Sequence, residues 1–352
     1  MVFEKETWFC CPDWMDLPKV EQIESFSDLE SVWFGDLNTK IRESILDGSY
    51  KYCSKERCPH LSKLVNSNKT ELELSHKSKY TQTEYFDLFY KRKKFFELYK
   101  DTQDLRYFPK LIYFNFDRSC NLRCPSCRLD LVPNEKNNRV TDIIKSINEQ
   151  FSTQVEMLHI TGSGDPFYSN AFREYLQTFN PKLYPKLKSM FLSTNGIMWT
   201  KKMWESMKSI HPYVGACEIS IDAATKDTYE TKTRLGGNWD KLINNLKYIS
   251  TIKTIRNITL SFVVQDSNVH EIVKFKNLVN DLFKDTKNNY LIMYRSIQDW
   301  NHQSEKWMEE QSVHIPTHPK HSILLEQLNE VGRDKNIQHN MWHLVPRIKS
   351  II

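Results

Sequence analysis

From residue 111 onward, six short apolar runs alternate with longer amphipathic stretches, and this alternation restricts the fold more than any other feature. The short runs have the length of strands, and the stretches between them have apolar residues at helical spacing. The predicted strands are 111–116, 155–161, 189–193, 217–221, 258–264 and 290–294, and the predicted helices are 140–151, 170–179, 200–210, 239–252 and 269–283. Successive strand–helix units build a parallel sheet covered by helices, open or closed into a barrel.

The two ends of the chain lack this regular pattern. Residues 1–65 are rich in cysteine, tryptophan and proline, with one predicted helix at 36–47 and little apolar material for a core. A bound metal could supply the missing stability. We therefore expect four parts: a cysteine-rich module at 1–65, a linker and docking helix at 66–109, the strand–helix region at 110–300, and a C-terminal extension at 301–352 with a short helix near 323–331.

The bulk composition is that of a globular protein, with 39% hydrophobic and 26% charged residues in 352. No run approaches the roughly 18 apolar residues of a membrane span, so no membrane partner is predicted. The start, Met1–Glu6, is charged where a signal peptide needs an apolar run, which predicts a cytoplasmic protein. The net charge of +5 is small, and the one dense basic run, Lys91–Lys94, fits a solvated helix face, so no nucleic-acid partner is indicated.

The cysteines are grouped rather than scattered. Seven of the eight fall in two clusters, which are Cys10, Cys11, Cys53 and Cys58, and then Cys120, Cys124 and Cys127. In a reducing compartment, closely spaced cysteines favour metal binding or catalysis over disulfides. Cys217 stands alone at the start of an apolar strand and is interpreted as a core residue.

The second cluster, Cys120-Asn121-Leu122-Arg123-Cys124-Pro125-Ser126-Cys127, directly follows the first predicted strand. Loops after the strands form the active-site face of barrel-like α/β folds. Three thiolates in one loop can hold three irons of a [4Fe–4S] cluster and leave the fourth open to a small molecule. The alternative, a structural zinc site, needs a fourth ligand. The nearest histidines are His76 and His159, and His159 lies inside an apolar strand.

Three further strand ends carry small and polar residues. The second strand ends in Thr161-Gly162-Ser163-Gly164-Asp165-Pro166, the third in Ser193-Thr194-Asn195-Gly196, and the fourth in Ser220-Ile221-Asp222-Ala223. Glycines let the backbone approach a ligand closely. Ser220 and Asp222 point to the same side of their strand. Taken singly, each segment also fits an ordinary turn or a satisfied strand end.

Together, the CxxxCxxC loop and these three segments resemble the radical S-adenosylmethionine (SAM) superfamily. The resemblance implies an α/β fold, a partial (β/α)6 TIM-type barrel, with a SAM-binding [4Fe–4S] cluster on the three loop cysteines. It implies that an electron from a donor such as flavodoxin or ferredoxin cleaves SAM to a 5′-deoxyadenosyl radical, which abstracts hydrogen from the substrate. It places S-adenosyl-L-methionine near Gly162, Ser163, Gly164, Asp165, Ser193, Asn195, Ser220 and Asp222.

One position departs from the family pattern. The family usually has an aromatic residue before the third cysteine, where this chain has Ser126. The adenine would then be held by other apolar groups, such as Val263 or Val264. Arg295, at the end of the sixth predicted strand, could meet the SAM carboxylate or the substrate, or could pair structurally.

The N-terminal cysteines resemble a SPASM or twitch module, which binds auxiliary [4Fe–4S] clusters and usually follows the barrel. The pattern runs from Phe9-Cys10-Cys11-Pro12 to Tyr52-Cys53 and Cys58-Pro59, so here it precedes the barrel. Four cysteines suffice for one auxiliary cluster, and if one of the adjacent Cys10 and Cys11 is not a ligand, an iron could be open to substrate. A zinc site and plain packing remain alternatives.

The resemblance favours an enzyme that matures a ribosomally made peptide or protein. Dehydrogenation or epimerisation of a carbohydrate or another small molecule is the enzymatic alternative. An iron–sulfur scaffold that binds SAM without turnover is the non-enzymatic one. That scaffold would not need the cysteine loop and three SAM-type segments in register, which argues against it.

Overall fold

The computed structural model describes residues 29–46, 49–54, 108–135, 138–161, 163–299, 303–332, 334–341 and 344. The chain divides into two compact units. The first contains the described residues up to Phe116 together with Asn138–Leu158 and Lys182–Ser189, and the second contains Asp117–Asn137, His159–Pro181 and the described residues from Met190 onward. None of the described helices is long and apolar enough to cross a membrane.

The strands form one sheet in which each strand lies beside the next along the chain, in the order β1-β2-β3-β4-β5-β6-β7. Their bounds are β1 Leu111–Phe114, β2 Met157–Ile160, β3 Ser189–Thr194, β4 Val214–Ser220, β5 Asn257–Val264, β6 Asn289–Ser296 and β7 Ile337–His339. The pairs from β3 to β7 are all parallel. This α/β architecture confirms the predicted partial TIM-type barrel.

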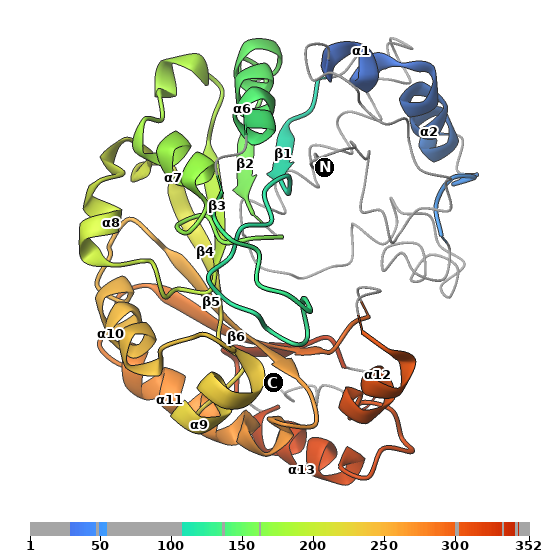
Figure 1. Cartoon of the computed structure of the whole chain (residues 1–352), viewed down its shortest axis with the longest axis vertical. Helices are drawn as coiled ribbons and strands as arrows, with labels where there is room; N and C mark the ends of the chain where they lie inside the picture. Colours follow the sequence, from blue (N-terminus) through green and yellow to red (C-terminus); the bar gives the residue numbers. More distant parts are fainter. Residues whose placement is uncertain are drawn as a thin grey trace, which may run out of the picture. The chain divides into compact units, whose positions relative to one another are not determined.

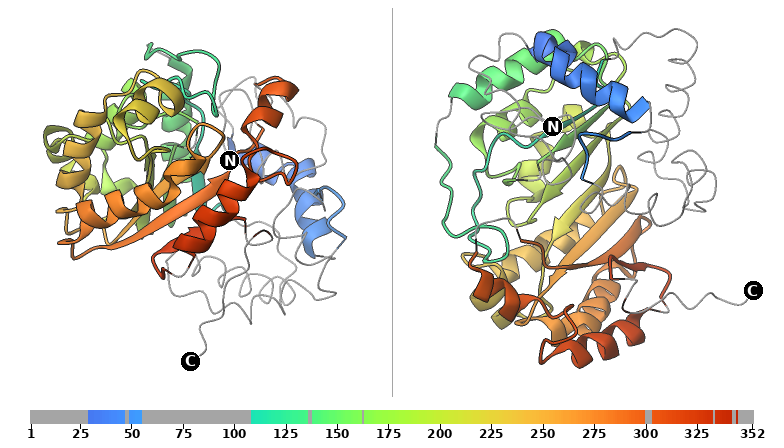
Figure 2. Two further views of the ribbon diagram at one scale, coloured as in Figure 1. Left: turned by 90° about the horizontal axis from the view of Figure 1, so that it is seen from below. Right: turned by 90° about the vertical axis from the view of Figure 1, so that its right-hand side faces the viewer.

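Helices and short helical turns follow the strands of the second unit. They are α7 Asn170–Gln177, α8 Lys201–Glu205, η4 Lys208–Ile210, α9 Lys226–Thr228, η5 Tyr229–Thr233, α10 Trp239–Ile249, η6 Val269–Glu271, α11 Ile272–Phe283, α12 Glu305–Gln311 and α13 His321–Val331. Helices α10 and α11 run along the same side of β4, β5 and β6 (Figure 1), and the turned views show the same layering (Figure 2).

Strand β5 shows why the sheet has one apolar and one polar side. Ile258, Leu260, Phe262 and Val264 are at most 1% exposed. The ring of Phe262 lies 4.9 Å from that of Phe275 in α11, so these residues face the helices. The alternate residues Thr259 and Ser261 therefore point to the other side. Of the two valines considered for holding the adenine, Val264 is thus part of the core, and Val263 lies on the same side of the sheet as Ser261.

The first unit contains α1 Leu29–Phe34, α2 Asp36–Leu46 and α6 Asn138–Gln150. The Glu30 N–H donates to Gln150 Oε1 at 2.9 Å, at the end of α6. The ring of Phe108 lies 5.1 Å from Phe34 and 6.4 Å from Phe151. The helices before the sheet therefore share apolar contacts with a helix of the strand–helix region.

All six predicted strands are present, but the sheet has a seventh, so the prediction of six was incomplete. Strand β7 lies within the residues predicted as a C-terminal extension and pairs with β6, Ile337 opposite Ile292. Three residues are too few to show a strand period, and pairing with β6 stabilises them. Helix α12 and the helical turns after β4 were also not predicted, whereas Cys217 is fully buried, as predicted.

Candidate active site

The cysteine loop is folded by its own backbone and joined to a second loop. The Cys120 N–H donates to Val132 O at 3.0 Å, and the Cys127 N–H donates to Cys124 O at 2.9 Å. Arg123 forms an antiparallel bridge with Leu235, in the loop after η5. Cys120 and Cys124 are buried, Cys127 is exposed, and all three are free thiols.

A different donor approaches each sulfur of the loop. Arg234 Nη1 lies 3.3 Å from Cys124 Sγ, Arg128 Nη2 lies 3.6 Å from Cys127 Sγ, and Asn195 Nδ2 lies 3.7 Å from Cys120 Sγ. Arg128 also donates to Ser163 O at 2.6 Å, which ties the loop to the end of β2. Hydrogen-bond donors at these distances are suited to sulfurs that carry negative charge, as metal-bound cysteines do.

Burial and charge act in opposite directions on these groups. Burial raises the pKa of the Cys120 thiol to about 12. Burial also raises the pKa of the Cys124 thiol, while the Arg234 guanidinium acts to lower it. Burial would lower the pKa of Arg234, but Asp222 and Cys124 raise it further, so Arg234 stays positively charged. A permanent cation therefore lies against the most buried thiol of the loop.

The donor set fits an iron–sulfur cluster. Thiolates are the preferred ligands of such clusters, each bound to a different iron. Within the described ranges, no group of three or more His, Cys, Asp or Glu side chains could hold a single metal ion. The buried Tyr229 hydroxyl and Arg234 Nε have no hydrogen-bond partner, and Arg234 contacts the Cys124 sulfur through Nη1. Orphaned polar atoms beside a buried thiol are what a missing polar group would satisfy.

The segment after β2 packs against the chain that leads into the cysteine loop. A Cβ added at Gly164 would lie 2.6 Å from Asp117 O and 2.7 Å from Ser119 O. The Asp165 N–H donates to Ser119 O at 2.9 Å. Gly164 is therefore required for the close approach of the chain to itself. Gly162, which was predicted to bind SAM, lies outside the described residues.

The carboxylate of Asp165 is used internally. One oxygen accepts from Thr194 Oγ1 at 2.7 Å and from the Asn195 N–H at 2.9 Å. The other accepts from the N–H groups of Phe167 and Tyr168. Burial raises the pKa of Asp165, and these hydrogen bonds act to lower it. Asp165 thus joins the ends of β2 and β3, which orients Asn195 toward Cys120.

The carboxylate of Asp222 is also used internally, but with a charged partner. Oδ1 accepts from the Val263 N–H at 2.7 Å, and Oδ2 lies 2.7 Å from Arg234 Nη2. Asp222 is 1% exposed and has a φ of 59°, a left-handed conformation that few non-glycine residues adopt. Thr161, at the end of β2, has a φ of 66°. Such strained residues cluster at functional sites.

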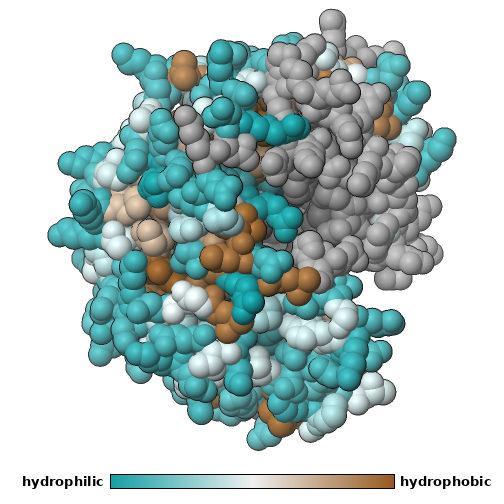
Figure 3. Space-filling model, in the orientation of Figure 1, coloured by the Kyte–Doolittle hydropathy of each residue, from teal (hydrophilic) through white to brown (hydrophobic). Residues whose placement is uncertain are grey.

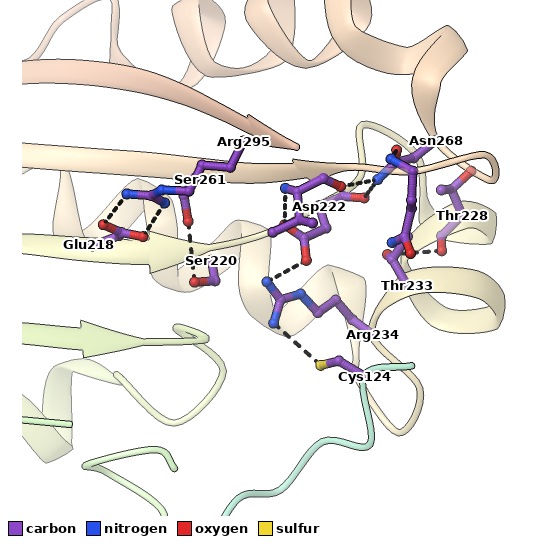
Figure 4. A network of polar contacts seen from close by, with 12 residues as sticks. Cys124, Glu218, Ser220, Asp222, Thr228, Thr233, Arg234, Ser261, Asn268 and Arg295 are labelled. Atoms are coloured by element: carbon purple, nitrogen blue, oxygen red, sulfur yellow. Dashed lines mark hydrogen bonds and ion pairs between the residues drawn. The ribbon is translucent and has the colours of Figure 1, made fainter. Parts of the chain in front are cut away.

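The remaining predicted site residues lie on the side of the sheet opposite the helices. Ser193 Oγ is 2.8 Å from His159 Nε2, and Ser220 Oγ accepts from Ser261 Oγ at 3.3 Å. Burial lowers the pKa of His159 to about 4, so its ring is neutral at ordinary pH. Arg295 pairs with both oxygens of Glu218, at 2.6 and 3.0 Å, which is the structural pairing considered from the sequence (Figure 4).

The structure brings the loop cysteines together with Asn195 and, through Arg234, with Asp222. Sequence reasoning missed Arg128, Tyr229 and Arg234. The available signals were, for Tyr229 and Arg234, the long stretch between the fourth predicted strand and the helix that follows it, and for Arg128 its position directly after Cys127. Of the N-terminal cysteines, Cys53 is half-buried in the first unit. Cys10, Cys11 and Cys58 lie outside the described residues.

Residues 114–279 match the sequence profile of the radical SAM superfamily. This part of the chain is therefore a radical SAM domain. The family implies a [4Fe–4S] cluster and S-adenosylmethionine, in agreement with the cysteine loop. A search of curated proteins found no significant match.

Several solved structures are distantly similar to the chain. Streptococcus suis SuiB bound to precursor peptide SuiA shares 13% identity, with a TM-score of 0.47 and coverage of 81% of this chain and 63% of SuiB. TYW1 with a bound lysine–pyruvate adduct shares 17% identity, with a TM-score of 0.41 and coverage of 64% and 74%. AnSMEcpe with bound AdoMet shares 15% identity, with a TM-score of 0.39 and coverage of 62% and 59%. The chain thus spans less than two thirds of the length of SuiB. Similarity at this level does not identify the activity of the present protein.

Proposed function

We propose that the protein is a cytoplasmic radical SAM enzyme that matures a peptide or protein, with its SAM-binding cluster on Cys120, Cys124 and Cys127. The observation that carries the cluster placement is the loop itself. Two of its thiols are buried, and each of the three has an Arg or Asn donor at 3.3–3.7 Å. When bound, the reduced cluster supplies the electron that cleaves SAM into methionine and a 5′-deoxyadenosyl radical.

The residues of the chain would orient the cluster and SAM and would exclude water from them. Arg128 and Arg234 would balance the negative charge of the thiolates. We propose that SAM lies along the strand ends, near Gly162, Ser163, Gly164, Ser193, Asn195 and Ser220. Asp165 and Asp222 would act through the residues they hold, because their oxygens are already bonded within the chain.

The support for a peptide or protein substrate is the cysteine-rich segment, whose pattern resembles modules found in enzymes that modify peptides or oxidise alcohols and sugars. In this proposal Cys10, Cys11, Cys53 and Cys58 hold an auxiliary [4Fe–4S] cluster. The two sites use different thiols, so removing one cluster should leave the other in place. Intact protein should then hold about eight irons, and a variant without the loop cysteines about four.

An electron donor such as flavodoxin or ferredoxin would contact the face that carries Cys127. Leu129 and Leu131, in the same loop, are 55% and 51% exposed. The space-filling view shows apolar side chains gathered near the middle of one face, with polar ones around them (Figure 3). Exposed apolar patches of this kind are typical of contact surfaces for other proteins.

The cluster placement is tested by SAM cleavage. Anaerobically purified protein with a strong reductant should convert SAM to 5′-deoxyadenosine, and the Cys120→Ala/Cys124→Ala/Cys127→Ala variant should not. Cys217→Ala is the matched control, because Cys217 is also a buried thiol but lies in β4 and not in the cysteine loop. Cleavage at the normal rate by the triple variant would contradict the proposal.

The substrate class is tested separately. The enzyme should be incubated with SAM and with any short peptide encoded beside its gene, and the peptide analysed by mass spectrometry. A SAM-dependent mass change that the Cys53→Ala/Cys58→Ala variant cannot produce would support peptide maturation and the auxiliary cluster together. An unchanged peptide, together with turnover of a sugar or other small molecule, would refute maturation and leave the radical SAM assignment intact.

A further inference from the structure

Arg234 contacts both a cysteine of the loop and a carboxylate at the end of β4. Its Nη1 lies 3.3 Å from Cys124 Sγ and its Nη2 lies 2.7 Å from Asp222 Oδ2 (Figure 4). We propose that Arg234 is a positioning residue that raises the reduction potential of the cluster by donating to the Cys124 sulfur. The inference rests on the proposed placement of the cluster on Cys124.

The backbone around Arg234 is held toward the cysteine loop. Residues Tyr229–Thr233 form a π-helical turn, and the Arg234 N–H donates to Tyr229 O at 2.8 Å. Single π turns are frequent at functional sites. The next residue, Leu235, accepts from the Arg123 N–H at 3.0 Å. Arg234 and Cys124 are therefore neighbours on two bridged segments, so their contact does not depend on a flexible side chain alone.

The carboxylate that orients the guanidinium is itself held in place. Asp222 accepts from the Val263 N–H, and its carbonyl oxygen accepts from Asn268 Nδ2 at 2.9 Å. The same amide nitrogen donates to Val263 O at 2.9 Å. With Nη2 held by Asp222, the planar guanidinium directs Nη1 at the sulfur.

Charge gives the expected sign of the effect. Hydrogen bonds to the sulfurs, net charge and solvent exposure set the potential of an iron–sulfur cluster. Reduction adds one negative charge, so a nearby cation stabilises the reduced form. The Arg234 side chain is 10% exposed, and water screens the interaction weakly at such a site. Asp222 is farther from the sulfur in the chain of contacts and offsets part of the effect.

The test is a redox titration of the full-length, anaerobically reconstituted protein without SAM, followed by electron paramagnetic resonance. The signal that is missing from the loop-cysteine triple variant identifies the cluster. In Arg234→Met, the ratio of reduced to oxidised cluster at a given potential should fall about tenfold, which is ~59 mV for one electron. In Asp222→Asn the ratio should rise, because the neighbouring negative charge is removed. Lys226→Met, which removes an exposed cation paired with Asp240, should leave it unchanged.

Opposite shifts separate an electrostatic role from loss of structure, which would move both variants the same way. Arg234→Lys keeps the charge and should restore part of the potential. Asp222→Asn/Arg234→Met leaves no unpaired buried charge, and its potential should lie between that of Arg234→Met and wild type. These two variants carry the test if Arg234→Met does not hold a cluster. An unchanged potential with weakened SAM binding would assign Arg234 to SAM and overturn the inference. The iron content and SAM cleavage of the unmodified protein test the cluster placement independently.

Discussion

The ends of β2 and β4 each hold a buried carboxylate and a residue with a left-handed backbone, which is Thr161 after β2 and Asp222 itself after β4, but the two carboxylates are stabilised differently. Asp165 accepts only from neutral donors, namely a hydroxyl and three backbone N–H groups. Asp222 accepts one backbone N–H and pairs with the Arg234 guanidinium. The two strand ends thus stabilise a buried carboxylate in two ways, by neutral hydrogen-bond donors after β2, the neutral end, and by an ion pair after β4, the charged end. At the β4 end a cation, Arg234, joins the carboxylate itself to a cysteine sulfur, whereas at the β2 end Arg128 joins Cys127 to the backbone carbonyl of Ser163.

The largest effect is expected at the charged end. Arg234→Met leaves Asp222 as an uncompensated buried charge, which should lower the free energy of unfolding by about 3–5 kcal/mol. Adding Asp222→Asn should recover much of this loss, because no buried charge then remains unpaired. Urea denaturation of the two variants and wild type measures both values. Equal losses in the single and double variants would show that the ion pair does not stabilise the β4 end.

At the neutral end, Gly164→Ala should be the most harmful single change. The new Cβ would lie under 3 Å from two carbonyl oxygens of the segment before the cysteine loop, so the two segments must separate. We expect a loss of about 3 kcal/mol and reduced iron binding. Gly236→Ala is the control, because its Cβ would meet Asn121 O at 3.5 Å and only the left-handed backbone at φ 85° costs energy, about 1–2 kcal/mol. A smaller loss at Gly164 than at Gly236 would contradict the close approach.

Asp165→Asn should cost less than breaking the Asp222–Arg234 pair. The amide keeps the shape but has one acceptor oxygen, so some of the four hydrogen bonds are lost, for about 2 kcal/mol. Because Asp165 holds the Asn195 backbone, SAM affinity measured by calorimetry should also fall. Thr178→Ala, which removes an exposed hydroxyl at the end of α7, should change neither value. A loss larger than that of Arg234→Met would reverse the comparison.

The last effect is confined to low pH and again involves β2. The pKa of His159 is lowered by burial to about 4, against about 6.5 in the unfolded chain. The unfolded chain therefore binds more protons between these two values, and the free energy of unfolding should decrease as pH falls through this window. His159→Gln should reduce this slope. Denaturation at several pH values measures it, and an equal slope in both proteins would show that His159 is not the group responsible.

Local sequence patterns determined the elements and the type of chemistry. The strand and helix periods of 111–294 are properties of neighbouring residues, so the six predicted strands are all present. Cys120, Cys124 and Cys127 are close together along the chain, so they lie in one loop whatever surrounds it. Strand β7 was not predictable in this way, because its three residues depend on pairing with β6.

Only the tertiary structure decided which groups surround the thiols. Arg234 is 110 residues from Cys124, and Asn195 is 75 from Cys120, so no local period relates them. It also decided that Asp165 and Asp222 bond within the chain, although a carboxylate at a strand end is equally suited to a ligand. The physical reason is that side-by-side alignment of parallel strands joins distant segments at one edge. Which donors then meet depends on packing and turn geometry, which residue spacing along the chain does not specify.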